Sequence, residues 1–349
     1  MDDSGQKHQR RIRYKGTHPT AFAEKYKELD PDNYAETIER VQKKGNTPAG
    51  THRPICVQEI LEILQIESGQ TGLDATLGYG GHAQAMLERL APEGHLFAID
   101  ADPIELPRTE ERLRKLGYGP EILSVRAMNF ADVDQLATET GPFQFVLADL
   151  GVSSMQIDNP IRGFSYKTDG PLDLRMNPQK GLPAAYRLRG MSEEEIEGML
   201  VANADEPHAA AIAAAIIFQY RQGKDIATTS ELRNVIRDAL ASLPKNEREA
   251  EIRKSCQRSF QALRVDVNHE YEALYAFLEK LPAILAPGGR VGILSFHSGE
   301  DRLVKKSFQQ YFKDGVYQEI APAVIRPSLE EQSANLRAGS AKLRWAIRS

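Results

Sequence analysis

Strand-like segments alternate with helical segments over much of this 349-residue chain. Strand character occurs at residues 71–76, 94–100, 121–130, 143–151 and 288–298, with helical stretches between the early segments. Strands that alternate with helices are joined by right-handed crossovers and form a parallel sheet covered on both faces. The sequence therefore predicts a doubly wound, Rossmann-like α/β fold.

The alternation stops between about residues 155 and 267, where a Gly/Pro/Asp-rich stretch precedes three helical patterns. Ser192 with Glu195 and Thr228 with Glu231 have the capping-box spacing that marks helix starts. We therefore predict an all-helical insertion that interrupts the α/β core. The expected domains are an N-terminal extension at 1–50, the core at 51–154 and 262–349, and the insertion at 155–261.

Composition excludes several classes of protein. The longest nearly apolar run, 209–218, is too short to span a membrane, and no secretory signal is visible at the N-terminus. We therefore expect a cytoplasmic chain with no membrane partner. The two cysteines have no metal-type spacing. A net charge of -5 argues against a surface that coats nucleic acid, although a basic segment at 7–15 and a polar helical stretch at 20–44 precede the core.

A glycine-rich turn follows the first strand-like segment and leads into a helix. Gly78, Gly80 and Gly81 let backbone amides approach a ligand, and the helix N-terminus adds partial positive charge. Asp100, at the end of the next strand, occupies the position where an acid accepts hydrogen bonds from ribose hydroxyls. The pattern favours a nucleotide-type cofactor; a turn that serves packing alone is the alternative.

The identity of that cofactor follows from two details. A diphosphate-binding turn has a third glycine where this chain has Ala83. Asp74, at the end of the first strand, is poorly placed for a diphosphate and well suited to a sulfonium-bearing amino acid. Both details favour S-adenosylmethionine over a nicotinamide dinucleotide. No metal is expected, since a sulfonium is already a good leaving group.

Three polar turns are expected at the carboxyl edge of the sheet, where open α/β sheets bind ligands. The first turn begins at Asp149, and the others lie at 162–176 and 295–302. An oxygen that accepts a proton from the methylated group is needed here. The rival catalytic candidates are Asp149, Ser153, Ser154 and Asp173. For each turn, internal Asp–Arg pairing is the structural alternative.

Seven ordered sequence blocks, at 52–54, 74–82, 149–158, 162–176, 259–268, 285–302 and 340–344, resemble the RsmH (formerly MraW) family of rRNA methyltransferases. The resemblance implies a class I methyltransferase that uses S-adenosylmethionine. It also implies N4-methylation of a cytidine in the decoding, P-site region of 16S rRNA within the small ribosomal subunit. The cofactor contacts that it implies are Gly80, Gly81, His82, Asp100, Phe130, Asp149 and Gln156.

The chain also departs from the family pattern. Tyr79 and Ala101 stand where arginines are usual, Gly299 replaces a leucine, and the customary His-Pro before Ser259 is missing. Together with the N-terminal extension, these departures indicate a divergent branch. Another RNA site is therefore an alternative target.

Substrate contacts are expected from the second and third turns and from the insertion. Phe164 and Tyr166 are candidates to stack on a base extracted from its neighbours, with anchoring of the loop as the alternative. His297 is a candidate for orienting the substrate. The candidate phosphate contacts are Arg162, Arg175 and Arg264.

Two other classes of function compete with this interpretation. An oxidoreductase lacks support, because the sequence shows no evident hydride-transfer pair. A non-catalytic RNA-binding or ribosome-assembly protein would keep the fold without binding the methyl donor. A homodimer is one assembly that the sequence allows.

Overall fold

The computed structural model describes residues 54–335 and 337–349. The predicted N-terminal extension, with its basic segment and its helical stretch, lies outside the described residues. Within the described residues, no helix is long and apolar enough to cross a membrane.

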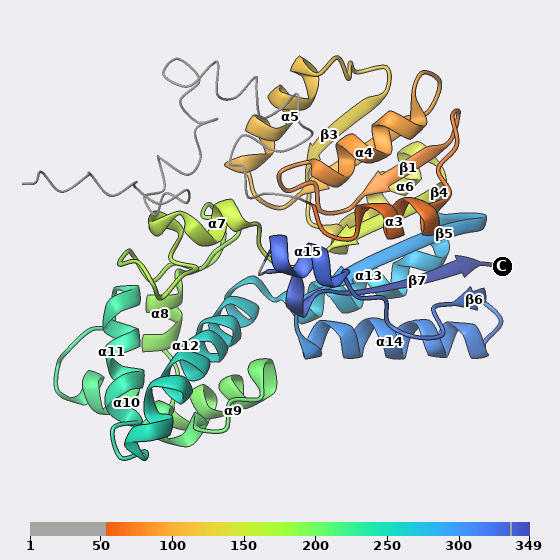
Figure 1. The fold of residues 1–349 in the computed structure, drawn as a ribbon. Helices are drawn as coiled ribbons and strands as arrows, with labels where there is room; N and C mark the ends of the chain where they lie inside the picture. The colour runs from red at the N-terminus through yellow and green to blue at the C-terminus, as the bar shows by residue number, and fades with distance from the viewer. Residues whose placement is uncertain (1–53, 336) are drawn as a thin grey trace, which may run out of the picture. The chain divides into compact units, whose positions relative to one another are not determined.

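A seven-stranded sheet with the order β3-β2-β1-β4-β5-β7-β6 forms the core of the fold (Figure 1). Neighbouring strands from β3 to β5 are parallel, whereas β7 is antiparallel to both β5 and β6. The predicted doubly wound α/β fold is confirmed. The strands are β1 (Thr71–Asp74), β2 (His95–Asp100), β3 (Leu123–Ala127), β4 (Phe143–Asp149), β5 (Leu285–Ser295), β6 (Tyr317–Ile320) and β7 (Lys342–Arg348).

Helices cover both faces of the sheet. Alternate side chains of a strand point to opposite faces, so apolar side chains on each face need to be buried. In β4, Phe145 and Leu147 join one hydrophobic cluster, and Val146 and Ala148 join another. The first cluster includes α3 (Val57–Leu64), α4 (Gly81–Leu90) and α5 (Glu105–Lys115). The second includes α6 (Val133–Thr140), α13 (Glu270–Ile284) and α14 (Ser298–Lys313).

Close packing between two central strands requires a glycine. Gly72 of β1 pairs with Phe145 of β4, and a Cβ added at position 72 would lie 1.9 Å from the Phe145 ring. The aromatic ring therefore fills space that a side chain on β1 would otherwise take. The order of strands reverses between β1 and β4, and in such sheets ligands bind beyond the carboxyl ends of the strands at that point.

Six helices follow β4 before the chain returns to the sheet at α13. They are α7 (Ser154–Asp158), α8 (Ala184–Arg189), α9 (Glu193–Ala204), α10 (Ala209–Arg221), α11 (Thr229–Ala239) and α12 (Lys245–Asn268). Residues between 164 and 263 bury a third hydrophobic cluster of their own. Both predicted capping boxes are present, at Ser192 in α9 and at Thr228 in α11.

The long helix α12 passes through the predicted end of the insertion at residue 261 and continues to Asn268. His269, in the left-handed region at φ 50°, then turns the chain into α13. The domain boundaries stay a prediction. The antiparallel strand β7 and the short helix α15 (Leu329–Ala334) complete the described chain.

Candidate active site

The glycine turn predicted to hold the cofactor lies between β1 and α4. Gly78 and Gly80 both have positive φ values, 49° and 74°, which glycine adopts without a steric penalty. The Thr109 hydroxyl of α5 donates a hydrogen bond of 2.7 Å to the Gly78 carbonyl. A Cβ at Gly80 would lie 2.9 Å from the Thr109 methyl group. The turn is therefore held against α5 at a spacing that glycine permits.

Asp100 faces this turn from the end of β2. Its Oδ2 accepts a 2.7 Å hydrogen bond from the Gly78 N–H, and its Oδ1 accepts one of 2.8 Å from the Asp102 N–H. Burial raises the pKa of the Asp100 carboxyl to about 6. The structure thus brings the predicted ribose-binding acid and the predicted glycine turn together.

Asp74 ends β1 and is almost fully buried. Burial raises the pKa of Asp74 to about 7; a hydrogen bond from the Thr76 N–H opposes this rise, and the charges of Asp149 and Asp100 add to it. Three carboxyl groups whose charges repel one another favour a cationic ligand beside them. This arrangement fits the sulfonium and ammonium groups of the predicted cofactor.

His82, on the first turn of α4, bonds to the backbone and faces Asp149. Its Nε2–H donates to the Ile55 carbonyl at 2.9 Å, because a carbonyl oxygen can only accept. Burial lowers the pKa of His82, so the neutral ring presents the lone pair of Nδ1. That atom lies 3.5 Å from Asp149 Oδ2. Direct contact with the cofactor stays a prediction for His82.

Asp149 ends β4 at the carboxyl edge of the sheet. Its backbone N–H donates to the Thr76 hydroxyl at 2.6 Å, which holds the end of β4 beside β1. Burial, together with the charge of Glu300, raises the pKa of Asp149 to about 7. Among the described residues, the buried Oδ1 of Asp149 has no hydrogen-bond partner. A buried carboxylate oxygen without a partner is costly, and this marks Asp149 as a candidate functional residue.

The two candidate serines follow in the next turn. Ser153 is the N-cap of α7, and its hydroxyl accepts from the Gln156 N–H at 3.3 Å. The Gln156 side chain completes the capping box by accepting from the Ser153 N–H at 2.7 Å. Ser154 is the first residue of α7. The Ser153 oxygen thus already has a structural role, which Asp149 Oδ1 lacks.

The 162–176 turn contains the internal Asp–Arg pairing that was its structural alternative. Arg175 donates to both carboxylate oxygens of Asp173 at 2.8 Å. Phe164 is buried in the insertion's hydrophobic cluster, and the Tyr166 ring packs edge-on against Phe260 at 5.8 Å between centroids. These contacts anchor the turn. Substrate binding by Phe164, Tyr166 and Arg175 stays a prediction, as does the catalytic role of Asp173.

Arg162 is held in a buried ion pair and Arg264 in a partly buried one. Arg162 is 5 % exposed and donates to Asp102 at 2.7 Å. Arg264 binds both carboxylate oxygens of Glu270 at 2.8 Å. Neither guanidinium is presented to solvent as a phosphate contact would be. Their assignment to the substrate therefore stays a prediction that the observed geometry does not favour.

His297 caps α14 at the end of β5. Its Nε2 lies 3.1 Å from Glu300 Oε1, and the Phe296 N–H donates to Glu300 Oε2 at 2.9 Å. Burial would raise the pKa of Glu300, but the His297 hydrogen bond and the nearby positive charges lower it overall. Glu300 is therefore a buried anion close enough to Asp149 to influence its ionisation. Phe130, a predicted cofactor contact, packs against Phe277 at 5.2 Å between ring centroids.

Two acidic residues of the site, Asp102 and Glu300, were not among the sequence candidates. Glu300 lies three residues after His297, the spacing of a capping box, and this signal could have identified it. Asp102 carries no such signal, because its partners Gln156 and Arg162 are more than fifty residues away in the chain.

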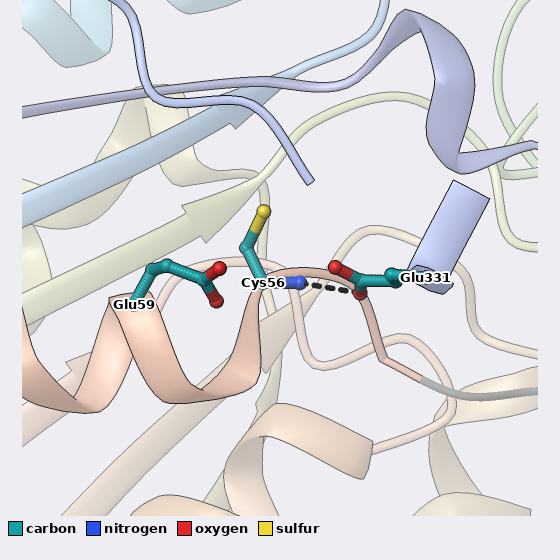
Figure 2. A group of neighbouring side chains, drawn as sticks. All are labelled: Cys56, Glu59 and Glu331. Carbon is teal, nitrogen blue, oxygen red and sulfur yellow. Dashed lines mark hydrogen bonds between the residues drawn. The ribbon is translucent and has the colours of Figure 1, made fainter. Parts of the chain in front are cut away.

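Two side-chain clusters resemble metal sites in composition only. Figure 2 shows Cys56 between Glu59 and Glu331, with the Cys56 N–H donating to Glu331 at 2.8 Å. Burial and the two glutamates raise the pKa of the Cys56 thiol to about 12, so the thiol is protonated. In the second cluster, Glu270, His297 and Glu300, both oxygens of Glu270 already accept from Arg264.

The parallel sheet, the glycine turn and the ring of carboxyl groups define a class I methyltransferase. The chain belongs to the MraW methylase family, which it matches over residues 49–349. The predicted family resemblance is confirmed. S-adenosylmethionine is the methyl donor of this class, and the buried acidic groups near Gly78 fit it.

Named relatives extend the comparison. The chain is 65 % identical over 349 residues to ribosomal RNA small subunit methyltransferase H 2 of Alkaliphilus metalliredigens, with both chains covered in full. It is 60 % identical to ribosomal RNA small subunit methyltransferase H 1 of Lachnoclostridium phytofermentans, covering 98 % of this chain and 93 % of the relative. Ribosomal RNA small subunit methyltransferase H of Acidobacterium capsulatum is 36 % identical, covering 84 % of this chain and 97 % of the relative.

Proposed function

We propose that this protein transfers a methyl group from S-adenosylmethionine to the N4 amine of a cytidine in the P-site region of 16S rRNA. The proposed substrate is RNA within the small ribosomal subunit, in the cytoplasm. The relatives' names support an rRNA substrate. The observation that carries the proposal is the buried Asp149 Oδ1, which lacks a hydrogen-bond partner among the described residues beside the cofactor turn.

The exocyclic amine of cytosine is a weak nucleophile, because its lone pair is delocalised into the ring. When bound, S-adenosylmethionine supplies an electrophilic methyl group on a good leaving group. An oxygen of the partly exposed Asp149 carboxylate would accept an N–H hydrogen bond from the amine, which concentrates electron density on nitrogen, and then receive the proton that the methylated amine loses. A uracil offers no N–H at this position, so the same oxygen discriminates between the two pyrimidines.

The neighbours of Asp149 position it and stabilise the form that results from proton transfer. Neutral His82 places the Nδ1 lone pair 3.5 Å from Asp149 Oδ2, so it can receive a hydrogen bond once the carboxyl has taken up the proton. The Thr76 hydroxyl fixes the backbone at the end of β4. Ser153, Ser154 and Asp173 are rival proton acceptors, but the Ser153 and Asp173 oxygens already accept hydrogen bonds from Gln156 and Arg175.

The decisive experiment compares 16S rRNA from a strain that lacks the gene with rRNA from its parent, by mass spectrometry of nucleosides and oligonucleotides. We expect loss of the N4-methylated cytidine from the P-site fragment and its return on complementation. Unchanged rRNA modification throughout would refute the proposed rRNA activity.

A purified-component assay tests the residue assignment. Small subunits from the deletion strain should accept methyl groups from wild-type protein and should not accept them from Asp149→Ala. An Asp149→Ala variant with full transfer would eliminate Asp149 as the proton acceptor.

A second candidate, methylation of another RNA site, is favoured by one contact. A Cβ at position 299 would lie 1.9 Å from the Tyr271 hydroxyl, so the leucine usual in the family does not fit beside this tyrosine. The Tyr271 hydroxyl donates to the Asn203 carbonyl of α9 at 3.1 Å. The third polar turn is thus packed differently from the family pattern. Loss of a methylated nucleoside outside the P-site fragment would favour this candidate.

A further inference from the structure

Asp102 is a buried carboxylate that contacts three separate parts of the site. It follows Asp100 by two residues and is 1 % exposed. Its Oδ1 accepts from the Ile104 N–H at 2.9 Å at the start of α5. Its Oδ2 accepts from the Gln156 amide at 2.6 Å and from the Arg162 guanidinium at 2.7 Å. One oxygen therefore binds both the turn after β4 and the loop that follows it.

The partners of Asp102 extend these contacts toward the acceptor side. The Gln156 oxygen accepts from the Ser153 N–H at 2.7 Å, which fixes the turn after Asp149. The other nitrogen of Arg162 donates to the Arg175 carbonyl at 3.0 Å and to the Met176 carbonyl at 2.8 Å. Both ends of the 162–176 loop are therefore tied to a single carboxylate.

The same residue is tied to the cofactor side through its backbone. The Asp102 N–H donates to Asp100 Oδ1 at 2.8 Å, while Asp100 Oδ2 accepts from Gly78. A continuous series of hydrogen bonds thus runs from the glycine turn through Asp100 and Asp102 to the 162–176 loop. A ligand that bonds to Asp100 acts directly on this series.

A buried ion pair is a poor source of net stability, because desolvation of both charges offsets their attraction. Apolar residues of similar volume could fill the space at Asp102 and Arg162 as well. An ion pair adds geometric specificity, because charge-assisted hydrogen bonds fix the relative position of the groups they join. The geometry is therefore better explained by a need for alignment than by a need for stability.

We propose that Asp102 is a positioning residue that couples cofactor binding at Asp100 to the ordering of the 162–176 loop. This inference rests on the proposed function and on the substrate contacts predicted for that loop. It gives Arg162 and Gln156 a role as partners of Asp102 in addition to their predicted ligand contacts. Cofactor bound at Asp100 restricts the motion of the 100–102 segment. The hydrogen bonds of Asp102 then restrict the turn after β4 and the 162–176 loop.

The first test needs no RNA. Hydrogen–deuterium exchange of the full-length protein is measured with and without S-adenosylhomocysteine, a stable product of the donor. In the wild type we expect the product to slow exchange in peptides covering 162–176, by about 5-fold or more. In Asp102→Asn, product binding should persist at the glycine turn, while this protection of the loop falls below about 2-fold.

A matched control removes an ion pair that does not touch the 100–102 segment. Arg187 of α8 bonds to Asp266 of α12, within the helical part of the chain. Asp266→Asn should keep the protection of the 162–176 loop by the product. If Asp102→Asn unfolds, Arg162→Lys tests the same link, because it retains the positive charge and loses the second hydrogen-bonding arm.

The second test measures coupling in the presence of substrate. Affinity for small subunits from the deletion strain is measured with and without the product, for the wild type and for each variant. The affinity with the product, divided by the affinity without it, should be about 5 or more in the wild type and in Asp266→Asn. The same ratio should be close to 1 in Asp102→Asn. A merely structural role would lower the melting temperature and leave the ratio unchanged.

Two results would overturn the proposal: loop protection that persists in both Asp102→Asn and Arg162→Lys, or a wild-type loop that does not respond to the product. Failure of the proposed function has a different signature. In that case the exchange experiment gives the expected pattern, and small subunits neither bind nor become methylated.

Discussion

The raised pKa of Asp149 predicts how the rate of methyl transfer depends on pH. As proton acceptor it must be ionised, and its pKa is raised to about 7. With that pKa, about 9 % of the protein is ionised at Asp149 at pH 6 and about 91 % at pH 8. We therefore expect kcat/KM to rise about 10-fold between these values and to level off above pH 8.

The assay follows transfer of a labelled methyl group to small subunits from the deletion strain at low substrate concentration, where the rate reports kcat/KM. Asp149→Asn should lower the rate roughly 10²- to 10⁴-fold and remove the rise between pH 6 and 8. The variant keeps the shape of the side chain and cannot accept a proton. A wild-type profile that is flat across this range would refute the reasoning.

Glu300→Gln provides a matched control, because the charge of Glu300 contributes to the raised pKa of Asp149. Removing that charge should move the midpoint of the profile to lower pH while the rise itself remains. A midpoint that moves upward would contradict the electrostatic explanation.

Three further predictions concern stability. Burial raises the pKa of Asp74 to about 7 in the fold from 3.8, the ordinary value for an aspartate, so ionisation costs stability as pH rises from 4 to 7. Asp74→Asn should therefore raise the free energy of unfolding at pH 8 by up to ~4 kcal/mol and change little at pH 4, as measured by urea titration. It should also weaken S-adenosylmethionine binding in calorimetry; unchanged affinity would remove Asp74 from the cofactor site. Gly72→Ala should cost roughly 1–3 kcal/mol because the new methyl group meets the Phe145 ring, and Phe145→Leu should recover part of that loss in the double variant. Glu331→Ala leaves the buried Cys56 N–H without its acceptor and should cost roughly 1–3 kcal/mol, seen as a lower urea midpoint with an unchanged slope.

Much of the sheet could be predicted because apolar strand segments end in recognisable turns. The strands β1, β2 and β4 fall within the predicted segments, and Asp74, Asp100 and Asp149 end them as expected. The antiparallel strand β7 gave no comparable signal. Lys342, Arg344 and Arg348 interrupt its apolar residues, which suits a strand that lies between β5 and a short outer strand.

The candidate site was predictable where function depends on local sequence. The glycine turn and the acid that follows one strand later are close in the chain, and the structure brings them together. The roles of Arg162 and Gln156 were not predictable in the same way. Their common partner Asp102 lies more than fifty residues earlier, and no periodicity or spacing in one sequence reports which buried charges meet.

The helical segment separates two paired strands, β4 and β5, in the sequence, and this affects how the chain folds. Strand β4 ends at Asp149 and its neighbour β5 begins at Leu285, so their pairing closes a loop of about 135 residues. Closing an unstructured loop of that length costs conformational entropy that few contacts offset at first. Residues 164–263 bury their own hydrophobic cluster, so helices that form early would shorten the loop before β4 and β5 meet. We therefore expect the helices to form before β4 and β5 pair.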